Sequence, residues 1–456
     1  MTEKINIHFL GAAGTVTGSK YLLETHDRNI LIDCGLFQGL KELRLKNWAH
    51  PPVKVSSIDA VLLTHGHLDH TGYLPRLVKQ GFNGSIYGTN PTLDITTIIL
   101  NDSAKIQEQE AERANKKGYS KHHPAKPLYD VIDVENTLPH FKRVPPAQWI
   151  PLFDRIKARF SYNGHILGGT YIELDVYGKR FVFSGDIGRT NDLLLYPPLK
   201  PKKADILFME STYGGRFHPE EAEAVPKIEK LIKETVARGG SLFIPSFSVE
   251  RAQLLMFILG GLVKKNKIPK IPMILDSPMG TDVLKLFYFS RDWHKLSEEA
   301  CLEMCSYFRV VKRYSETLEL RADNNPKIII AGSGMLTGGR ILNYLEKQAG
   351  NPNNTLLFVG FQAEGTRGRK LLEGDQSFKV FGKWVPFNMQ MEIIEGLSAH
   401  ADHSELLNWL SELENKPERI FIVHGEKESA EALKQGIKET YNWDSEIPEL
   451  YGIVAL

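Results

Sequence analysis

The chain has 456 residues, of which 42% are hydrophobic and 24% charged, and its formal net charge at pH 7 is +1. This length exceeds one ordinary hydrophobic core and predicts two domains or a large insertion, while the balanced charge neither requires nor excludes a nucleic-acid partner. Three cysteines cannot form a disulfide framework, and no apolar run matches a secretory signal or a membrane helix, so we expect a cytoplasmic protein without membrane contact.

Short strand-like runs punctuated by Gly and Asp dominate the chain up to about residue 205. They are Ile5 to Leu10, Tyr21 to Leu23, Ile30 to Ile32, Val61 to Thr64, Tyr171 to Val176 and Phe181 to Ser184. Strands with few helices between them and polar side chains at their ends are typical of a layered α/β domain. The charged segment from Asn101 to about Pro146 differs, and we expect it to be partly helical.

Longer alternation of strands and helices begins near Glu210. Strands are predicted at Ser241 to Ile244, Met273 to Leu275 and Lys327 to Ala331, and helices at Val249 to Val263 and Arg340 to Gln348. Repeated strand–helix units indicate a parallel sheet with crossover helices, and hence a second α/β domain. Short strands return at Met389 to Ile394 and Arg419 to Val423. We therefore predict a first domain in two parts, residues 1–208 and 376–456, with an inserted domain at residues 209–375.

A cluster of potential metal ligands, His65-Gly-His67-Leu-Asp69-His70, directly follows the apolar run Val61 to Thr64. In extended chain the first two histidines point the same way, whereas the last two ligands come as the chain turns and can face a second ion. Further along, His165 and Asp186 each stand at a strand end beside glycine, which lets the backbone approach an ion closely. A histidine-rich loop and ordinary turns are the alternatives, but the density of ligand types favours a metal site.

Together with Asp33, these ligands form an ordered set that resembles the metallo-β-lactamase superfamily, which has a four-layer αββα fold and carries one or two metal ions. Three later motifs resemble the β-CASP branch of nucleases: Glu210 in Glu-Ser-Thr-Tyr-Gly, His400 in Ser-Ala-His-Ala-Asp and His424 in Val-His-Gly-Glu. The similarity covers nearly the whole chain and extends to bacterial and archaeal ribonucleases related to the mRNA 3′-end cleavage factor. It implies an α/β protein, with an αββα metallo-β-lactamase fold and an inserted β-CASP domain made of a parallel sheet with flanking helices.

The resemblance implies two zinc ions per chain, with manganese as the alternative because carboxylates also accept it. The implied ligands are His65, His67 and His165 for one ion and Asp69, His70 and His424 for the other, with Asp186 bridging them. Asp33 would orient a ligand histidine, and a simple turn before Cys34-Gly35 is its alternative role.

Two adjacent metal ions can lower the pKa of a shared water, and the resulting hydroxide can attack a phosphorus held in line. The predicted function is a zinc-dependent ribonuclease that leaves 3′-hydroxyl and 5′-phosphate ends, cutting internally, from the 5′ end, or both. His400 would donate a proton to the leaving oxygen, and Glu210 would hydrogen-bond to His400 and hold it protonated. The alternatives are a capping or core role for His400 and a surface carboxylate for Glu210.

Residues after two strands of the inserted domain also match the family and predict contacts with the phosphates of single-stranded RNA. Hydroxyls and backbone amides at strand-to-helix turns are good phosphate donors. The expected contacts are Ser246, Ser248, Arg251, Ser333, Gly334, Met335 and, in a later motif, Ser398. The basic stretch from Gly365 to Lys370 fits an RNA contact and an interdomain hinge equally well.

A DNA nuclease of the same branch is the main rival function, and a noncatalytic RNA-processing scaffold is another. Relatives that act on DNA tend to lack a histidine at the last motif, so His424 favours RNA. All seven implied ligands and His400 are present, which argues against an eroded scaffold. The resemblance also implies a homodimer.

Overall fold

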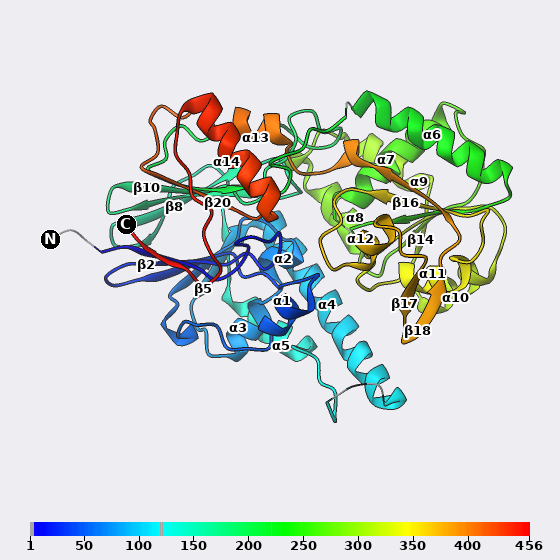
Figure 1. Ribbon diagram of the computed structural model, residues 1–456, viewed down its shortest axis with the longest axis horizontal. Helices are drawn as coiled ribbons and strands as arrows, with labels where there is room; N and C mark the ends of the chain where they lie inside the picture. The colour runs from blue at the N-terminus through cyan, green and yellow to red at the C-terminus, as the bar shows by residue number, and fades with distance from the viewer. Residues whose placement is uncertain (1–3, 119, 121, 220, 248) are drawn as a thin grey trace. The chain divides into compact units, whose positions relative to one another are not determined.

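The computed structural model describes residues 4–118, 120, 122–219, 221–247 and 249–456, and the structural statements that follow concern these residues. The chain forms two compact units. The first comprises Met1–Phe217 and His400–Leu456, and the second comprises His218–Ala399. Figure 1 traces the chain from the first unit into the second and back.

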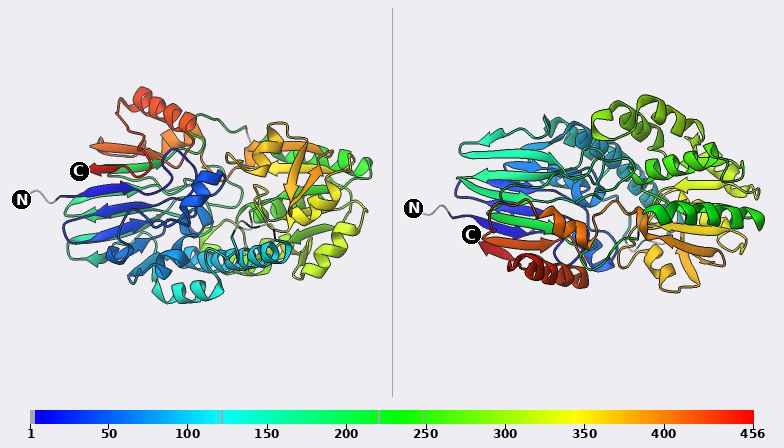
Figure 2. Two further views of the ribbon diagram at one scale, coloured as in Figure 1. Left: turned by 60° about the horizontal axis from the view of Figure 1, so that its bottom comes forward. Right: turned by 90° about the horizontal axis from the view of Figure 1, so that it is seen from above.

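Two sheets lie at the centre of the first unit (Figures 1 and 2). The seven-stranded sheet has the order β21-β1-β2-β3-β4-β5-β6, and the six-stranded sheet has the order β20-β11-β10-β9-β8-β7. The strands of the first sheet are β1 Asn6–Phe9, β2 Tyr21–Glu24, β3 Asn29–Ile32, β4 Ala60–Leu62, β5 Ser85–Thr89, β6 Phe141–Val144 and β21 Ile453–Ala455. Those of the second sheet are β7 Ile150–Phe153, β8 Ile156–Tyr162, β9 Thr170–Val176, β10 Lys179–Phe183, β11 Ile206–Glu210 and β20 Arg419–Val423. Phe9 and Tyr21 of the first sheet pack against Phe208 of the second, so a hydrophobic core fills the space between the sheets.

Helices cover the outer face of each sheet. They are α1 Lys41–Lys46, α2 Leu68–Thr71, α3 Leu74–Lys79, α4 Asn90–Lys117, α5 Val131–Thr137, α13 His403–Trp409 and α14 Lys427–Tyr441, with short 3₁₀ turns η1 Val55–Ser57 and η2 Leu138–His140. Leu93 of α4 packs with Val61 on the first sheet, and Trp409 of α13 packs with Leu207 on the second. The unit therefore has four layers, αββα, and the predicted fold is confirmed.

Helix α4 spans 28 residues, starting eleven residues before the charged segment in which only partial helix was expected. The Thr89 hydroxyl accepts a hydrogen bond from Thr92 N, and Pro91 lies in the first turn, where its missing N–H costs nothing. Gly118 ends the helix in the left-handed conformation, with φ 65°. None of the described helices, α4 included, combines the length and apolar character that crossing a bilayer requires.

The second unit is built on a parallel sheet of order β14-β13-β15-β12-β16-β19, as predicted for this part of the chain. Its strands are β12 Leu242–Pro245, β13 Met273–Asp276, β14 Arg309–Val311, β15 Ile328–Ala331, β16 Thr355–Val359 and β19 Gln390–Ile394, and a hairpin adds β17 Ser377–Val380 and β18 Lys383–Pro386. The helices are α6 Glu221–Ala237, α7 Arg251–Lys264, α8 Gly280–Phe289, α9 Glu298–Ser306, α10 Tyr314–Ala322, α11 Ile341–Gln348 and α12 Arg367–Leu372, with 3₁₀ turns η3 Arg291–Trp293 and η4 Glu395–Leu397. Every residue of β12, β13, β15 and β16 is buried, as expected of parallel strands covered on both faces.

One strand belongs to a different unit from the one expected. The run Met389 to Ile394 was predicted to start the return to the first domain, but β19 pairs in parallel with β16 along its whole length. Residues 376–399 therefore lie in the second unit, and the return falls at His400. A six-residue run in which Gln390 and Glu392 alternate with apolar residues does not specify its partner strand, because main-chain pairing depends on distant residues.

Candidate metal centre

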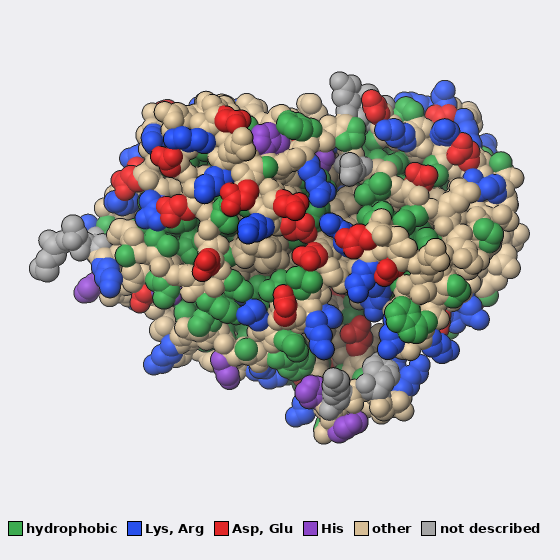
Figure 3. Space-filling view, in the orientation of Figure 1, with side chains coloured by type: hydrophobic (Ala, Val, Ile, Leu, Met, Phe, Trp, Pro, Cys, Tyr) green, Lys and Arg blue, Asp and Glu red, His purple; other side chains and the backbone are tan. Residues whose placement is uncertain are grey.

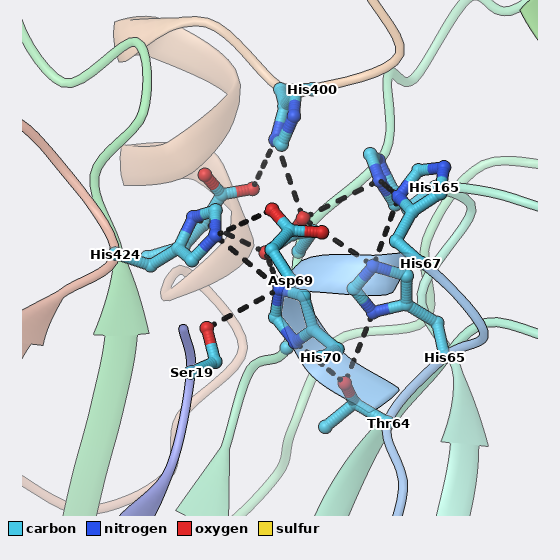
Figure 4. A network of polar contacts seen from close by, with 12 residues as sticks. Ser19, Thr64, His65, His67, Asp69, His70, His165, His400 and His424 are labelled. Atoms are coloured by element: carbon cyan, nitrogen blue, oxygen red, sulfur yellow. Dashed lines mark hydrogen bonds and ion pairs between the residues drawn. The ribbon is translucent and has the colours of Figure 1, made fainter. Parts of the chain in front are cut away.

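Ligand-type side chains of the first unit gather where strands of both its sheets end (Figure 4). Asp33 follows β3, His65 and His67 follow β4, Asp69 and His70 lie in α2, His165 follows β8, Asp186 follows β10 and His424 follows β20. Because β10, β11 and β20 are parallel neighbours, their carboxyl ends meet at one sheet edge. Residues far apart in the sequence thereby become neighbours.

The first ligand group is formed by three histidines and a carboxylate. His67 Nδ1 lies 3.1 Å from His65 Nε2 and 3.2 Å from His165 Nε2. Asp186 Oδ2 lies 3.5 Å from Nε2 of both His65 and His165. Ligand atoms 2.0–2.1 Å from a tetrahedral zinc ion lie about 3.3–3.4 Å apart, so these four atoms fit one such ion.

A second group, Asp69, His70 and His424, adjoins the first. His424 Nε2 lies 3.3 Å from His70 Nε2 and 3.7 Å from Asp69 Oδ2. The other oxygen of Asp186, Oδ1, lies 3.3 Å from His70 Nε2, so this carboxylate touches both groups. Asp186 is only 1% exposed, yet Oδ1 accepts no hydrogen bond of normal geometry. An unsatisfied buried charge is costly, and a cation held between the groups would satisfy it.

Asp33 and Thr64 orient the ligand imidazoles. Asp33 Oδ2 accepts hydrogen bonds from His70 Nδ1 at 2.7 Å and from the Thr64 hydroxyl at 2.8 Å. Thr64 Oγ1 also lies 3.0 Å from His65 Nδ1, from which it can accept. Protons on Nδ1 of His65 and His70 leave the lone pair of each Nε2 directed at the ligand group.

Thr212 orients the His424 ring in the same way, since Thr212 Oγ1 lies 3.1 Å from His424 Nδ1. Neither Thr64 nor Thr212 was among the residues singled out from the sequence. Thr64 offered one signal, a buried polar residue at the end of a strand and next to a histidine. Thr212 offered none beyond its place inside the Glu-Ser-Thr-Tyr-Gly motif.

The protonation states of His65, His67 and Asp186 suit metal binding, whereas burial of His70 is outweighed by Asp186 and Asp33, which raise the pKa of His70 well above its usual value. Burial lowers the pKa of His65 well below its usual value and lowers the pKa of His67 to about 4, so both rings are neutral near pH 7. Burial raises the pKa of Asp186, but His424 and His70 outweigh burial and hold that pKa well below the usual carboxyl range. Neutral imidazoles and an ionised carboxylate are the forms that coordinate metal ions.

His400 and Glu210 form a pair beside the two groups. Glu210 ends β11 and is fully buried, and its Oε1 lies 3.3 Å from His400 Nδ1. The His400 ring lies against that of His165, with centroids 4.5 Å apart, and its Nδ1 is 4.0 Å from Asp186 Oδ2. Burial lowers the pKa of His400, but Glu210 and other carboxylates outweigh burial and raise that pKa above its usual value. An 18% exposed imidazolium next to the ligands is suited to donate a proton.

Tight backbone turns fix these positions. Asp33 and His424 both have left-handed backbone conformations, with φ 57° and 48°, which turn the chain sharply as it leaves a strand. Gly35 packs so closely on α2 that a Cβ atom there would lie 1.5 Å from Asp69 O. The amide of Cys34 donates to His70 O at 2.7 Å, which fastens the same two segments together.

Two of the expected phosphate contacts lie side by side in the second unit. Ser246 and Ser333 follow the neighbouring strands β12 and β15, and Ser246 N donates to Ala331 O at 3.0 Å. Ser333 Oγ accepts from Thr337 N at 3.0 Å. Arg251 begins α7 and is buried, and its Nη1 has no hydrogen-bond partner among the described residues.

The other expected contacts are less informative. Gly334 packs on the Phe247 ring, Met335 and Ser398 are buried, and Ser248 lies outside the described residues. The basic stretch is largely engaged within the unit. Thr366 caps α12, Arg367 donates to main-chain oxygens, and Arg369 pairs with Glu373.

Three protein families match the chain in sequence. The "Metallo-beta-lactamase superfamily" matches residues 13–232, the "Beta-Casp domain" residues 252–371, and the "Zn-dependent metallo-hydrolase RNA specificity domain" residues 384–448.

Similar proteins come from bacteria and archaea. "Ribonuclease TTHA0252" of Thermus thermophilus is 35% identical over 93% of this chain and 94% of the relative. "Transcription termination factor FttA" of Methanocaldococcus jannaschii is 31% identical over 97% of this chain and 70% of the relative. A crystal structure of a protein of unknown function from Enterococcus faecalis V583 superposes with a TM-score of 0.53 over 99% of this chain and 100% of the other, at 14% identity, and shares the fold alone.

Proposed function

Since the chain belongs to the β-CASP branch of the metallo-β-lactamase superfamily, we propose that it is a metal-dependent ribonuclease. It hydrolyses phosphodiester bonds of single-stranded RNA and leaves 3′-hydroxyl and 5′-phosphate ends. The relative named a ribonuclease is matched over 94% of its length, which supports RNA as the substrate.

The observation that carries this proposal is the joining of three groups by one carboxylate. Asp186 belongs to the first ligand group, its Oδ1 lies 3.3 Å from His70 Nε2 of the second, and its Oδ2 lies 4.0 Å from His400 Nδ1 of the Glu210–His400 pair. A pair of metal sites with an adjacent proton donor is what hydrolysis of a phosphodiester requires. A site for binding alone would not need the donor.

The ions we propose are two zinc ions, with manganese as the alternative. His65, His67, His165 and Asp186 would hold one, and Asp69, His70, His424 and Asp186 the other. When bound, such ions supply a water of lowered pKa and neutralise charge on the phosphoryl oxygens.

His400 holds the proton that the leaving 3′ oxygen takes up. Glu210 faces Nδ1 of His400, so in this proposal the proton is delivered from Nε2. Glu210 is itself held by the amide of Ile187, which donates to Oε1 at 2.6 Å. Its carboxylate therefore orients the ring and favours the protonated form.

Within the second unit, Ser246, Ser333 and Arg251 are the residues we propose to contact substrate phosphates. Arg251 has a buried guanidinium nitrogen without a hydrogen-bond partner among the residues that the structure describes, and a phosphate oxygen would satisfy it. We further propose a homodimer, which sedimentation of the purified chain tests directly.

Cleavage of end-labelled RNA and DNA of one sequence, with metal content measured on the same sample, tests the proposed function. We expect the protein to cleave the RNA and to hold two divalent ions per chain. We expect Asp186→Ala to lose both the cleavage and the bound ions. Equal or better cleavage of the DNA would make the chain a DNA nuclease, and full metal content without any cleavage would make it a scaffold. RNA labelled at either end and carrying different 5′ groups separates internal from 5′-end cutting.

A further inference from the structure

The β17–β18 hairpin of the second unit has one face in the core and one in solvent. Its two-residue turn, Phe381 and Gly382, has positive φ at both positions, 47° and 86°, as in the tight turns that suit twisted hairpins. Phe378 and Val385 are direct cross-strand partners and are buried in the core of the unit. Alternation along the strands therefore turns the next pair to the opposite face.

That next pair is Lys379 and Trp384, which lie directly opposite each other across the hairpin. Trp384 is 70% exposed and Lys379 is exposed as well. Tryptophan is usually well buried, and its indole presents a large flat surface. So exposed a ring contributes little to the stability of the unit.

Basic side chains lie on the hairpin and on the helix beside it. Lys379 lies opposite Trp384 on the same face, whereas Lys383 pairs with Val380 and alternation turns it toward the other face. Lys370 is exposed on α12, which packs against β17. Figure 3 shows Lys and Arg side chains around a hydrophobic side chain over this hairpin. Protein–protein interfaces are depleted in lysine, so an exposed tryptophan directly opposite a lysine favours a polyanion over a protein partner.

The hairpin is also tied to the turn after β15 that contains Ser333. Arg367 donates from Nε to Lys379 O at 2.8 Å and from Nη1 to Leu336 O at 2.9 Å. One arginine thus bridges the strand that carries the exposed pair and the turn proposed to contact phosphates. The two surfaces are held in a fixed relation within the second unit.

We propose that the outer face of this hairpin is an additional binding surface for single-stranded RNA. A base stacks on Trp384 while Lys379, on the same face, contacts an adjoining phosphate. The inference rests on the proposed ribonuclease function for its choice of ligand. It adds a contact that fixes how substrate lies on the second unit, apart from the metal centre.

Binding of a fluorescently labelled 20-nucleotide oligouridine to the metal-loaded protein tests the proposal, in a His400→Ala background to slow cleavage. Adding Trp384→Ala raises Kd about 5- to 100-fold, the effect of losing one stacked base, whereas Trp384→Phe stays near the parent value. Changing Lys379 to alanine lowers the salt slope of log Kd by about 0.7 for each phosphate that the protein no longer neutralises. Phe289→Ala, which removes a 78% exposed ring at the end of α8, leaves Kd unchanged.

Hydrolysis of bis(p-nitrophenyl) phosphate by the otherwise unchanged protein separates this surface from the metal centre. Trp384→Ala retains that hydrolysis, because so small a diester has no base to stack. If the protein cuts no phosphodiester at all, the proposed function is wrong. The binding assay would still show whether the hairpin binds RNA. The inference would be overturned if Trp384→Ala left Kd unchanged, or if Phe289→Ala weakened RNA binding as much as Trp384→Ala does. It would also be overturned if Trp384→Ala altered sedimentation without altering RNA affinity.

Discussion

Replacing Asp33 by asparagine tests how the second ligand group is maintained. Asp33 is 1% exposed, and its Oδ2 accepts from His70 Nδ1 at 2.7 Å and from Thr64 Oγ1 at 2.8 Å, while Oδ1 accepts from Thr64 N at 2.8 Å. The amide of Thr64 can only donate, so the asparagine oxygen takes the Oδ1 position and its NH₂ group faces His70. Two donors then oppose each other unless His70 carries its proton on Nε2, where it blocks metal binding.

The expected size of the effect follows from these contacts. Loss of the hydrogen-bond acceptor on the ring nitrogen that does not bind the metal commonly lowers metal affinity about 10- to 100-fold. This corresponds to about 1.4–2.7 kcal/mol of binding free energy. The two bonds to Oδ2 are charge-assisted and contribute about 1.5–3 kcal/mol each, so the loss of unfolding free energy is bounded at about 3–6 kcal/mol. The first group keeps the lone pair of His65, because the Thr64 hydroxyl can rotate and still accept from that ring.

Competition with a chromophoric chelator, together with metal content per chain, measures the affinity of each ion. Asp33→Asn should keep one ion at its original affinity and bind the other 10- to 100-fold more weakly. Asp192→Asn is the matched control, because Asp192 is also buried and accepts hydrogen bonds from the amides of Leu194 and Leu195, neither of which is a ligand residue. Equal weakening of both ions, or no weakening of either, would refute the reasoning.

Three further substitutions probe neighbouring parts of the centre. His400→Ala should slow RNA cleavage about 10²- to 10⁴-fold at unchanged metal content and RNA affinity, and loss of metal would instead make His400 a ligand. Thr212→Val removes the partner of His424 Nδ1 at nearly constant volume and should weaken one ion about tenfold by the same chelator competition, so an unchanged affinity counts against this role. Gly35→Ala places a Cβ 1.5 Å from Asp69 O and should lower the free energy of unfolding by about 3 kcal/mol or more in urea, and a neutral effect would contradict this packing.

The sequence predicted the fold class and family correctly because local pattern carries both. Ligand types at the ends of apolar runs gave the cluster from His65 to His70, and the repeated strand–helix pattern gave the parallel sheet of the second unit. The partner of β19 could not be predicted, since a short strand-like run does not specify which strand it joins. The roles of the Thr64 and Thr212 hydroxyls could not be predicted either, because they depend on which ring nitrogen each histidine turns toward the hydroxyl.

The geometry of the centre depends on the first unit alone, although the second unit is inserted between Glu210 and His400. β11 ends at Glu210, which pairs in parallel with the residue before His424 on β20. The outgoing and returning segments are joined by a hydrogen bond from His403 N to Arg216 O at 2.9 Å. Closing a longer loop between fixed ends adds little free energy, since the cost grows only with the logarithm of its length. The insertion can therefore differ in size or surface without separating His400 from Glu210.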